Sequence, residues 1–243
     1  MKFVVDAYGT DKGEEVVVRG CADALSKRPD LEIIIVGNSD ILSPILANLS
    51  YDKERLEIVD AKDTISNNES PTKAIKDKPQ STLAVACDIC HVRDDVDGLI
   101  SAGSTGALLT GAILKIGRLP GVLRPALSPI LPSGSSGYVA LCDSGANVDC
   151  KPEYLAQFAV MAAAFMKAVS GVENPRVALV SVGEEDKKGN ELTHAAFELI
   201  KQTKLNFVGN MEARYALSGD YDVLVCDGFV GNVLLKTIEG TAM

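Results

Sequence analysis

Short apolar runs that end in turns of small and polar residues constrain this chain more than any other feature. Four such turns follow the runs that end near Ile100, Leu141, Val182 and Val225, and a segment of helical periodicity follows each turn. Near-continuous apolar runs are typical of strands buried on both faces of a parallel sheet. Strands that alternate with helices predict an α/β fold with a mostly parallel sheet flanked by helices.

The remaining elements follow from the same periodicities, and we treat residues 1–243 as a single α/β domain. A turn rich in Gly and Ser at 132–137 lies between two apolar runs, which predicts a β-hairpin and therefore a mixed sheet. The helix predicted over 152–170 is apolar nearly all round, so it is central or covered by a second subunit, and we favour a homodimer. We predict strands at 2–5, 32–36, 56–59, 126–131, 138–142, 176–182 and 223–225, and helices at 14–27, 41–49, 79–93 and 108–117.

The first of the four turns, Ser-Ala-Gly-Ser-Thr-Gly at 101–106, is suited to an anion. Ser104 or Thr105 can cap the following helix, whose free amides and dipole favour negative charge. Ligands of parallel α/β sheets bind outside the carboxyl ends of the strands. The turns therefore predict a site for a small anionic ligand, held by amides, hydroxyls and lysine. The other candidate residues at strand ends are Asp6, Asp143, Asn147, Lys188, Asn190, Asp227 and Asn232.

Each of these candidates also has a structural interpretation. Asp6 precedes a Gly loop, which is as common in plain turns as in active sites, and Lys187 and Lys188 belong to a charged run that is usually solvated. A lysine that lies where a strand passes into a helix can nevertheless pair with phosphate as a point charge.

Composition excludes several classes of function. The net charge of −9 argues against bulk binding to nucleic acid. The G-x-x-x-x-G-K-[ST], G-x-G-x-x-G and G-x-S-x-G motifs are all absent, and His91 and His194 are the two histidines, which argues against a zinc site or a His-based triad. We therefore expect no cofactor and no metal. The N-terminus resembles a strand rather than a signal peptide, so we expect a cytoplasmic protein.

The six cysteines are expected to be reduced thiols. Cys87 and Cys90 match a haem-attachment spacing with His91, but burial within a helix is the preferred interpretation. Cys142 and Cys226 each precede an Asp at a strand end, which leaves an acyl-cysteine intermediate as an alternative to a buried strand residue.

Over the whole chain these turns resemble, in order, the motifs of the PlsX-type acyl-acyl-carrier-protein:phosphate acyltransferases. The matching stretches include 101–106, Gly-Ala-Asn-Val-Asp-Cys-Lys-Pro-Glu at 145–153, Gly-Glu-Glu-Asp-Lys-Lys-Gly-Asn-Glu-Leu at 183–192, and Cys-Asp-Gly-Phe at 226–229. The chain departs from the family at Ser104, where the family has Asn, and at Tyr8-Gly9-Thr10, where it has Met-Gly-Gly. The family also continues past Met243, so we expect this chain to lack the C-terminal segment.

The resemblance implies a doubly wound α/β fold related to isocitrate dehydrogenase-like and phosphotransacetylase folds. It also implies a homodimer, peripheral association with the inner face of the membrane, and a downstream glycerol-phosphate acyltransferase. In the implied reaction, inorganic phosphate attacks the fatty-acyl thioester of acyl carrier protein and gives acyl phosphate for phospholipid synthesis. The enzyme has only to position the reactants and stabilise developing charge.

Within that reaction we expect Lys188 to stabilise the phosphate and the developing oxyanion, with Asn147 as the second catalytic residue. The amides around Ser104, Thr105 and Gly106 would bind phosphate oxygens, and Asn190 and Asn232 would orient substrate. Asp6, Asp143 and Asp227 are also assigned to orient substrate, and we expect the last two to fix loop structure rather than to transfer protons.

Two other functions remain open from the sequence. A short-chain phosphate acyltransferase that uses coenzyme A would need the same anion site, and a non-catalytic membrane-associated binding module would fit a chain without the family's C-terminal segment. The acyl-chain preference and the surface that docks the carrier are not fixed by these motifs.

Overall fold

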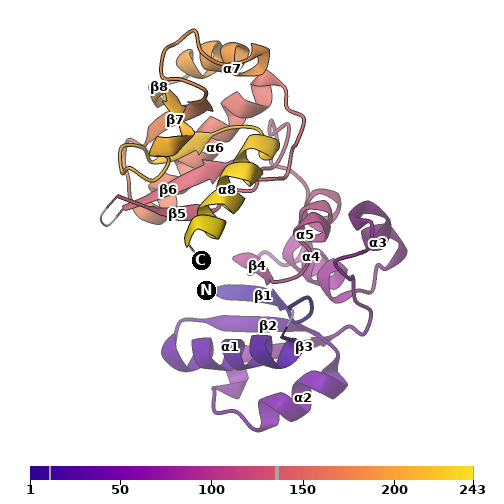
Figure 1. Cartoon of the computed structure of the whole chain (residues 1–243). Coiled ribbons are helices and arrows are strands. Elements are labelled where there is room, and N and C mark those ends of the chain that lie inside the picture. Colours follow the sequence, from indigo (N-terminus) through magenta and orange to yellow (C-terminus); the bar gives the residue numbers. More distant parts are fainter. Residues whose placement is uncertain (11, 135–136, 243) are drawn as a thin grey trace. The chain divides into compact units, whose positions relative to one another are not determined.

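The computed structural model describes residues 1–10, 12–134 and 137–242 (Figure 1). The chain forms two compact units, Met1–Gly117 and Arg118–Met243, and each unit has its own sheet. Both sheets are flanked by helices, so the predicted α/β class is confirmed. The single domain predicted over residues 1–243 stays a prediction.

The first unit is built on a four-stranded sheet in which every pair is parallel. Its strands, in spatial order, are β3 (Leu56–Asp60), β2 (Glu32–Gly37), β1 (Lys2–Asp6) and β4 (Gly98–Ser101). Helices α1 (Glu14–Lys27) and α2 (Ser39–Ala47) pack on one face, and α4 (Thr82–Val92) packs on the other (Figure 1). This arrangement follows from alternation along β1, because Val5 belongs to the core beneath α1 and Val4 to the core beneath α4.

Three further segments complete the first unit. Helix α3 (Pro71–Asp77) packs against α5 (Thr105–Gly111), and α5 continues as a wider π-helical turn over Ala112–Ile116. A short 3₁₀ turn, Lys53–Arg55, precedes β3. The helix predicted at 108–117 thus begins three residues earlier than expected, directly after the Ser104 cap.

The second unit has a five-stranded mixed sheet. In spatial order its strands are β5 (Ile130–Ser133), β6 (Gly137–Cys142), β9 (Val223–Val225), β7 (Arg176–Ser181) and β8 (Asn206–Glu212). The predicted antiparallel hairpin is confirmed for β5 and β6, and the other pairs are parallel. Helices α6 (Pro152–Ser170) and α7 (Glu191–Lys201) cover one face and α8 (Gly228–Ala242) covers the other, with the 3₁₀ turn Ala213–Tyr215 after β8.

Three predictions about the second unit are wrong in detail. Strand β8 was not predicted, because its sequence is interrupted by Gly209 and Asn210 and lacks a continuous apolar run. The strand predicted at 126–131 begins only at Ile130, since the Leu127 N–H donates to the Asp143 side chain instead of a neighbouring strand. Helix α8 begins at Gly228, inside the fourth of the predicted turns, because Asp227 caps it.

Helix α6 is partly exposed despite its apolar sequence. Leu155, Phe158 and Met166 are fully buried against the sheet, whereas Val160 and Val169 are about half exposed. An apolar outer face is compatible with a homodimer, which stays a prediction. None of the helices in the described ranges is both long and apolar enough to cross a membrane.

Candidate active site

The loop after β6 is organised around the carboxylate of Asp143, which is fully buried. Its Oδ1 accepts the N–H groups of Leu127, Gly145 and Ala146 at 2.9, 3.3 and 3.1 Å. Its Oδ2 accepts the backbone N–H and the side-chain amide of Asn147 at 2.7 and 2.9 Å. An ionised carboxylate is acceptor-only, which suits a loop that turns its N–H groups inward. Asp143 therefore fixes the loop, as we expected.

Asn147 is held by both hydrogens of its side-chain amide. Its Nδ2 donates to the Pro125 carbonyl at 2.8 Å and to Asp143, and its own carbonyl accepts the N–H of Gly228 at 2.7 Å. The side-chain donors are thus used within the protein, and only the side-chain oxygen is left for a ligand. This geometry makes Asn147 a residue that joins the loop after β6 to the start of α8. A catalytic role for Asn147 stays a prediction.

Lys188 lies on an exposed loop that is nevertheless fixed from below. The Lys188 carbonyl accepts the Ser181 hydroxyl at 3.2 Å and the Asn210 amide at 3.4 Å. Asn210 is buried on β8, and its Nδ2 also donates to the Glu185 carbonyl at 2.9 Å. The ring Nε2 of His194, on α7, bonds to the Lys187 carbonyl at 2.9 Å. The charged loop after β7 is therefore clamped by side chains from three elements.

The Lys188 side chain crosses over Gly183. A Cβ built on Gly183 would lie 2.9 Å from both Lys188 Cγ and Glu185 Oε2, so the absence of a side chain there makes room for the lysine stem. Within the described ranges no carboxylate forms an ion pair with the Lys188 ammonium, although fifteen such pairs form elsewhere. The ammonium is exposed and available to an anion.

Two helix starts and the end of β7 enclose a hollow of about 320 Å³ at the carboxyl edge of this sheet. Asn190 caps α7 by accepting the Thr193 N–H at 2.9 Å, and Asp227 caps α8 by accepting the Val230 N–H at 2.8 Å. Asn232, one turn along α8, donates to the Ser144 carbonyl at 3.3 Å. The residues that line the hollow are Val180, Ser181, Val182, Gly189, Asn190, Thr193, Ala213, Cys226, Asp227 and Val230.

The remaining predicted site residues lie at the carboxyl edge of the first unit's sheet. Asp6 is buried at the end of β1, where it accepts the Ser101 hydroxyl at 2.8 Å, and Ser101 in turn accepts the Gly103 N–H at 3.1 Å. Burial raises the pKa of Asp6, while hydrogen bonds from Thr82, Ser101 and Tyr8 oppose that shift. Asp6 therefore supports the turn from within.

The turn that Asp6 supports is suited to an anion. The Ser104 hydroxyl caps α5 through the Ala107 N–H at 3.4 Å, and the first amides of a helix have no partner within the helix. Thr105 is exposed, and Gly9 with Gly103 make a contact so close that a Cβ on Gly9 would lie 2.3 Å from Gly103 Cα. The structure thus gathers Ser104, Thr105 and Gly106 with Asp6 in one unit and the other six candidates in the second. Their joint action stays a prediction.

Comparison with known proteins identifies the family. A family model described as "Fatty acid synthesis protein" matches residues 1–243. A phosphate acyltransferase from Clostridium acetobutylicum is 49% identical over 243 residues, which are all of this chain and 73% of that protein. A putative phosphate acyltransferase from Clostridium perfringens is 50% identical over 244 residues, covering 100% of this chain and 71% of that protein. The chain belongs to the fatty acid synthesis protein family.

Solved structures share the fold of this family member. A phosphotransacetylase from Streptococcus pyogenes gives a TM-score of 0.75 at 20% identity and covers 100% of this chain and 82% of its own. A 4-hydroxythreonine-4-phosphate dehydrogenase from Burkholderia phymatum gives a TM-score of 0.54 at 15% identity, over 98% and 83% of the two chains. Both the family resemblance and the expected relation to phosphotransacetylase and dehydrogenase-like folds are confirmed.

Burial argues against a cysteine nucleophile in this member of the family. Cys142 and Cys226 are each no more than 2% exposed. Burial raises the pKa of the Cys142 thiol to about 12 and that of the Cys226 thiol well above its ordinary value. Cys87 is likewise buried in α4, and burial raises its pKa to about 12. The interpretation of these thiols as buried strand and helix residues is supported.

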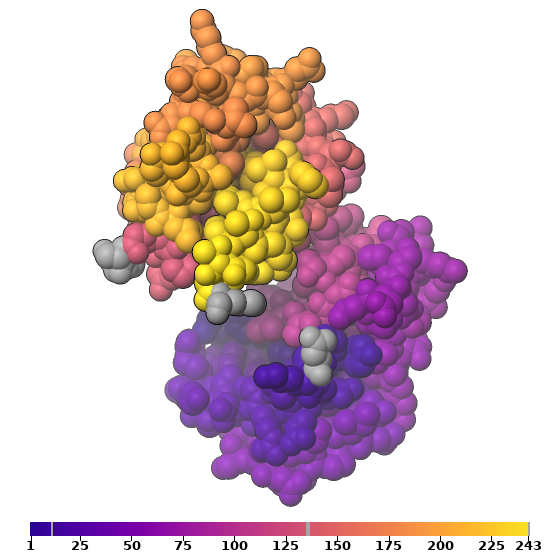
Figure 2. Space-filling model, in the orientation of Figure 1, coloured from indigo at the N-terminus to yellow at the C-terminus, as the bar shows by residue number. Residues whose placement is uncertain are grey.

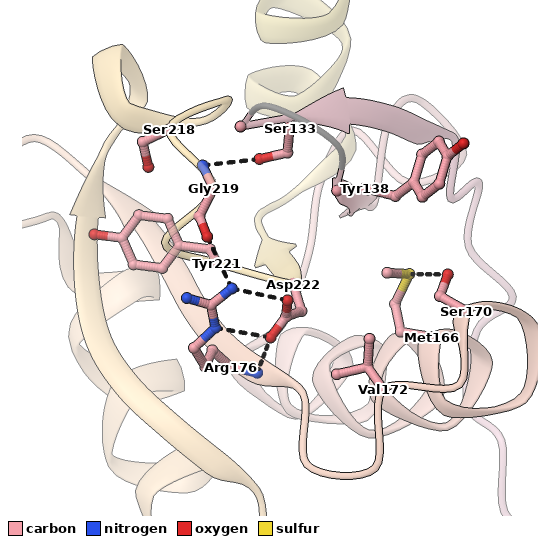
Figure 3. A pocket seen from close by; sticks show the side chains of 12 residues that line it. Ser133, Tyr138, Met166, Ser170, Val172, Arg176, Ser218, Gly219, Tyr221 and Asp222 are labelled. Atoms are coloured by element: carbon pink, nitrogen blue, oxygen red, sulfur yellow. Dashed lines mark hydrogen bonds and ion pairs between the residues drawn. The ribbon is translucent and has the colours of Figure 1, made fainter.

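Another hollow of the second unit, of about 560 Å³, lies at the opposite edge of the sheet (Figure 3). There the Arg176 guanidinium forms a two-pronged pair with Asp222, at 2.9 and 3.0 Å, and also donates to the Gly219 carbonyl. Because this is the amino edge of β7 and β9, and the arginine is occupied by a buried carboxylate, we assign the pair to stability rather than to ligand binding.

Sequence patterns missed the residues that clamp the Lys188 loop. Asn210 was missed because β8 was not predicted, and Ser181 was treated only as part of a strand. His194 is exposed, and its bond to the Lys187 carbonyl could not be foreseen from the sequence. A polar residue inside β8 is the one local signal that points to Asn210.

Proposed function

We propose that this protein transfers a fatty-acyl group from a thioester to inorganic phosphate and releases acyl phosphate and a free thiol. Membership of the family makes the chain an acyltransferase, and its relatives carry the name phosphate acyltransferase. The observation that carries the proposal is Lys188, an exposed ammonium without an ion pair in the described ranges, on a clamped loop at the carboxyl edge of a parallel sheet.

The chemistry needs little from the protein beyond position and charge. A phosphate oxygen attacks the thioester carbonyl, the carbonyl oxygen gains negative charge, and the C–S bond breaks as the thiolate leaves. The Lys188 ammonium offsets the charge on phosphate and on the developing oxyanion. Asn190 and Asn232 orient the substrate in this proposal, and Asn147 acts by holding the loop beside them.

The amides around Ser104, Thr105 and Gly106 share in binding phosphate in this proposal. Support comes from the cap that Ser104 provides and from the buried Asp6 that holds the preceding turn. A helix start of this kind favours an anion through its free N–H groups and its dipole.

The donor and the partners are the finer part of the proposal. We take acyl carrier protein as the acyl donor, phospholipid synthesis as the use of the acyl phosphate, a homodimer as the assembly, and peripheral contact with a membrane beside a glycerol-phosphate acyltransferase. The apolar outer face of α6, with Val160 and Val169 about half exposed, supports the homodimer. A short-chain enzyme that uses coenzyme A is the alternative, and comparing both thioesters with phosphate separates the two.

Replacing Lys188 with Met tests the proposal directly. Lys188→Met keeps an apolar stem across Gly183 and removes the charge. We expect kcat/KM for phosphate-dependent loss of acyl-carrier thioester to fall by roughly 10²–10³, the usual effect of losing one group that stabilises the transition state. Thermal unfolding should be unchanged, because the ammonium makes no ion pair in the described part of the chain.

Lys187→Met is the matched control. Lys187 is an exposed neighbour whose backbone carbonyl, not its side chain, is held by His194. We expect its turnover to stay within about twofold of the parent, the range of an ordinary surface substitution. Equal losses of turnover in both variants would mean that the positive charge of the loop matters, rather than Lys188 in particular. Full turnover in Lys188→Met would remove Lys188 from the mechanism, and absence of phosphate-dependent turnover in the parent would leave the binding-module alternative.

A further inference from the structure

The hollow at the carboxyl edge of the second sheet is lined mainly by apolar surface. Val180, Val182, Ala213, Cys226 and Val230 supply most of its walls. Two of the polar residues that line it are used as helix caps, since the carbonyl oxygen of the Asn190 side chain caps α7 and Oδ1 of Asp227 caps α8. Such a hollow offers a ligand apolar contact inside and polar groups only at its rim.

The mouth of the hollow exposes apolar side chains to solvent. Val182 is 79% exposed at the end of β7, and Val230 is 39% exposed on the first turn of α8. The same helix presents Phe229 and Val233, which are 62% and 53% exposed, and α8 lies at the surface of its unit in Figure 2. Of these exposed residues, Val182 and Val230 line the hollow itself. Exposed apolar side chains at a pocket are typical of a binding site for an apolar group.

We infer that this hollow receives the hydrocarbon chain of the acyl thioester, an inference that rests on the proposed function. Gly189 lines the hollow and directly follows Lys188, so the loop that carries the lysine borders the hollow. An apolar cavity of about 150 Å³ accommodates benzene. A hollow of about 320 Å³ therefore has room for on the order of a dozen carbon atoms.

A second apolar groove, of about 370 Å³, competes for this assignment. It lies in the first unit between α1 and the sheet, where Phe3, Val17, Gly20, Ala24 and Ile100 are among its lining residues. This groove runs alongside the strands rather than at their carboxyl ends, and Asp30 engages both of its cations: its carboxylate pairs with Arg28 and its carbonyl accepts the N-terminal ammonium of Met1. The hollow bordered by the Lys188 loop lies at the carboxyl ends of strands, so it is the better site.

Two substitutions on different elements fill the hollow. Val230→Trp enlarges a half-exposed side chain on α8, and Ala213→Phe enlarges an exposed residue in the 3₁₀ turn after β8. The measurement is kcat/KM with phosphate for a series of straight-chain thioesters from four to sixteen carbons. In the parent we expect kcat/KM to rise about fourfold per added methylene until the hollow is full, at on the order of a dozen carbons.

In both variants we expect kcat/KM to stop rising at a shorter acyl chain than in the parent. We expect at least about 100-fold lower kcat/KM for the longest chains, with the four-carbon substrate within about threefold of the parent, because each lost methylene contact costs about fourfold. Ala24→Trp, which fills the groove beside α1, is the matched control and should keep the parent's profile. An unchanged profile in Val230→Trp and Ala213→Phe overturns the inference, as does an early stop in Ala24→Trp.

Binding of decanoate, measured by calorimetry, separates failure of the inference from failure of the proposed function. We expect Val230→Trp to weaken decanoate binding at least tenfold and Ala24→Trp to leave it unchanged. Loss of decanoate binding in Val230→Trp from a parent that consumes no thioester would support the hollow and refute the proposed transfer to phosphate. Equal decanoate binding in all the proteins would overturn the inference even if the parent is active.

Discussion

Single side chains at the carboxyl edge of the second sheet act mainly as clamps. Asp143 accepts five hydrogen bonds, four from its own loop and one from the Leu127 N–H, and Asn210 supports the Lys188 loop through two carbonyls. Both are buried, so neither is free to touch a substrate. The residues left to meet a ligand are therefore those above the clamps, and Lys188 is among them, with an ammonium that forms no ion pair in the described ranges.

At this scale the thiols give a prediction about mechanism. At pH 8 a thiol of pKa about 12 is ionised to on the order of 10⁻⁴, so Cys142 should react negligibly with iodoacetamide, and Cys226 is as deeply buried. We expect the native protein to keep nearly all its turnover after treatment, and peptide mapping to find both thiols unlabelled. The same protein in urea should label at every cysteine. Labelling of Cys142 or Cys226 in step with loss of turnover would restore the acyl-cysteine mechanism.

At the scale of elements, the first turn of α8 is fitted against the loop after β6 with no room for a side chain. A Cβ on Gly231 would lie 1.9 Å from the Asp143 carbonyl oxygen, and one on Gly228 would lie 2.7 Å from the Asn147 carbonyl oxygen. These contacts are between backbone atoms, so a clash here can be relieved only if the helix or the loop shifts. The position of Asp227, Val230 and Asn232 therefore depends on glycines one turn apart.

Gly231→Ala should accordingly destabilise the protein. Overpacking of this kind costs about 1–3 kcal/mol or more, which is a fall in Tm of roughly 3–10 °C for a chain of this size. Gly240→Ala, in the same helix with nothing within 4 Å of its Cβ, is the control, and it should be neutral or stabilising by up to about 1 kcal/mol. Thermal melts followed by circular dichroism measure both. Equal melting temperatures for the two variants would mean that α8 moves freely on the sheet.

The elements that could be predicted are those whose own sequence determines them. The apolar runs of β2, β7 and β9 and the caps of α5 and α7 are local, and they placed the candidate turns at strand carboxyl ends. Strand β8 could not be predicted in this way, because Gly209 and Asn210 break its pattern. The hydrogen bonds that hold the Lys188 loop depend on which strand lies beside β7. Local sequence patterns do not reveal which strands are neighbours in the sheet.

At the scale of the whole molecule, the chain builds two cores where periodicity alone suggested one sheet. The residues between the units, around 118–125, carry prolines and glycine that predict a loop but not a division between cores. Each sheet has helices on both faces, so each buries its own apolar surface. The candidate residues are divided between the two units. Substitutions in each unit are therefore needed to test whether these residues act together.

The ion pair between Arg176 and Asp222 should make the stability of the protein depend on pH. Burial alone would raise the pKa of Asp222, but hydrogen bonds from the Arg176 side chain and N–H outweigh burial and lower it below its ordinary value of 3.8. A carboxylate with a lowered pKa stabilises the fold above the pKa of the unfolded chain, and the stabilisation disappears as pH falls through the lowered value. The pair ties the start of β7 to the residue before β9, so its loss should be felt by the whole second sheet.

Asp222→Asn should therefore be less stable than the parent at pH 7, by about 1–2 kcal/mol, because it leaves the partly exposed Arg176 without its carboxylate. That loss corresponds to roughly 2–8 °C in Tm. Melts of both proteins from pH 7 to pH 3 should draw together below about pH 4, where Asp222 of the unfolded chain becomes protonated, and the gap should close only as pH falls through the lowered pKa of the folded protein. Asp220→Asn, an exposed neighbour, is the control and should follow the parent at every pH. A gap between parent and Asp222→Asn that stays constant down to pH 3 would mean that the carboxylate's charge contributes nothing, and that the pair holds the sheet through shape and neutral hydrogen bonds alone.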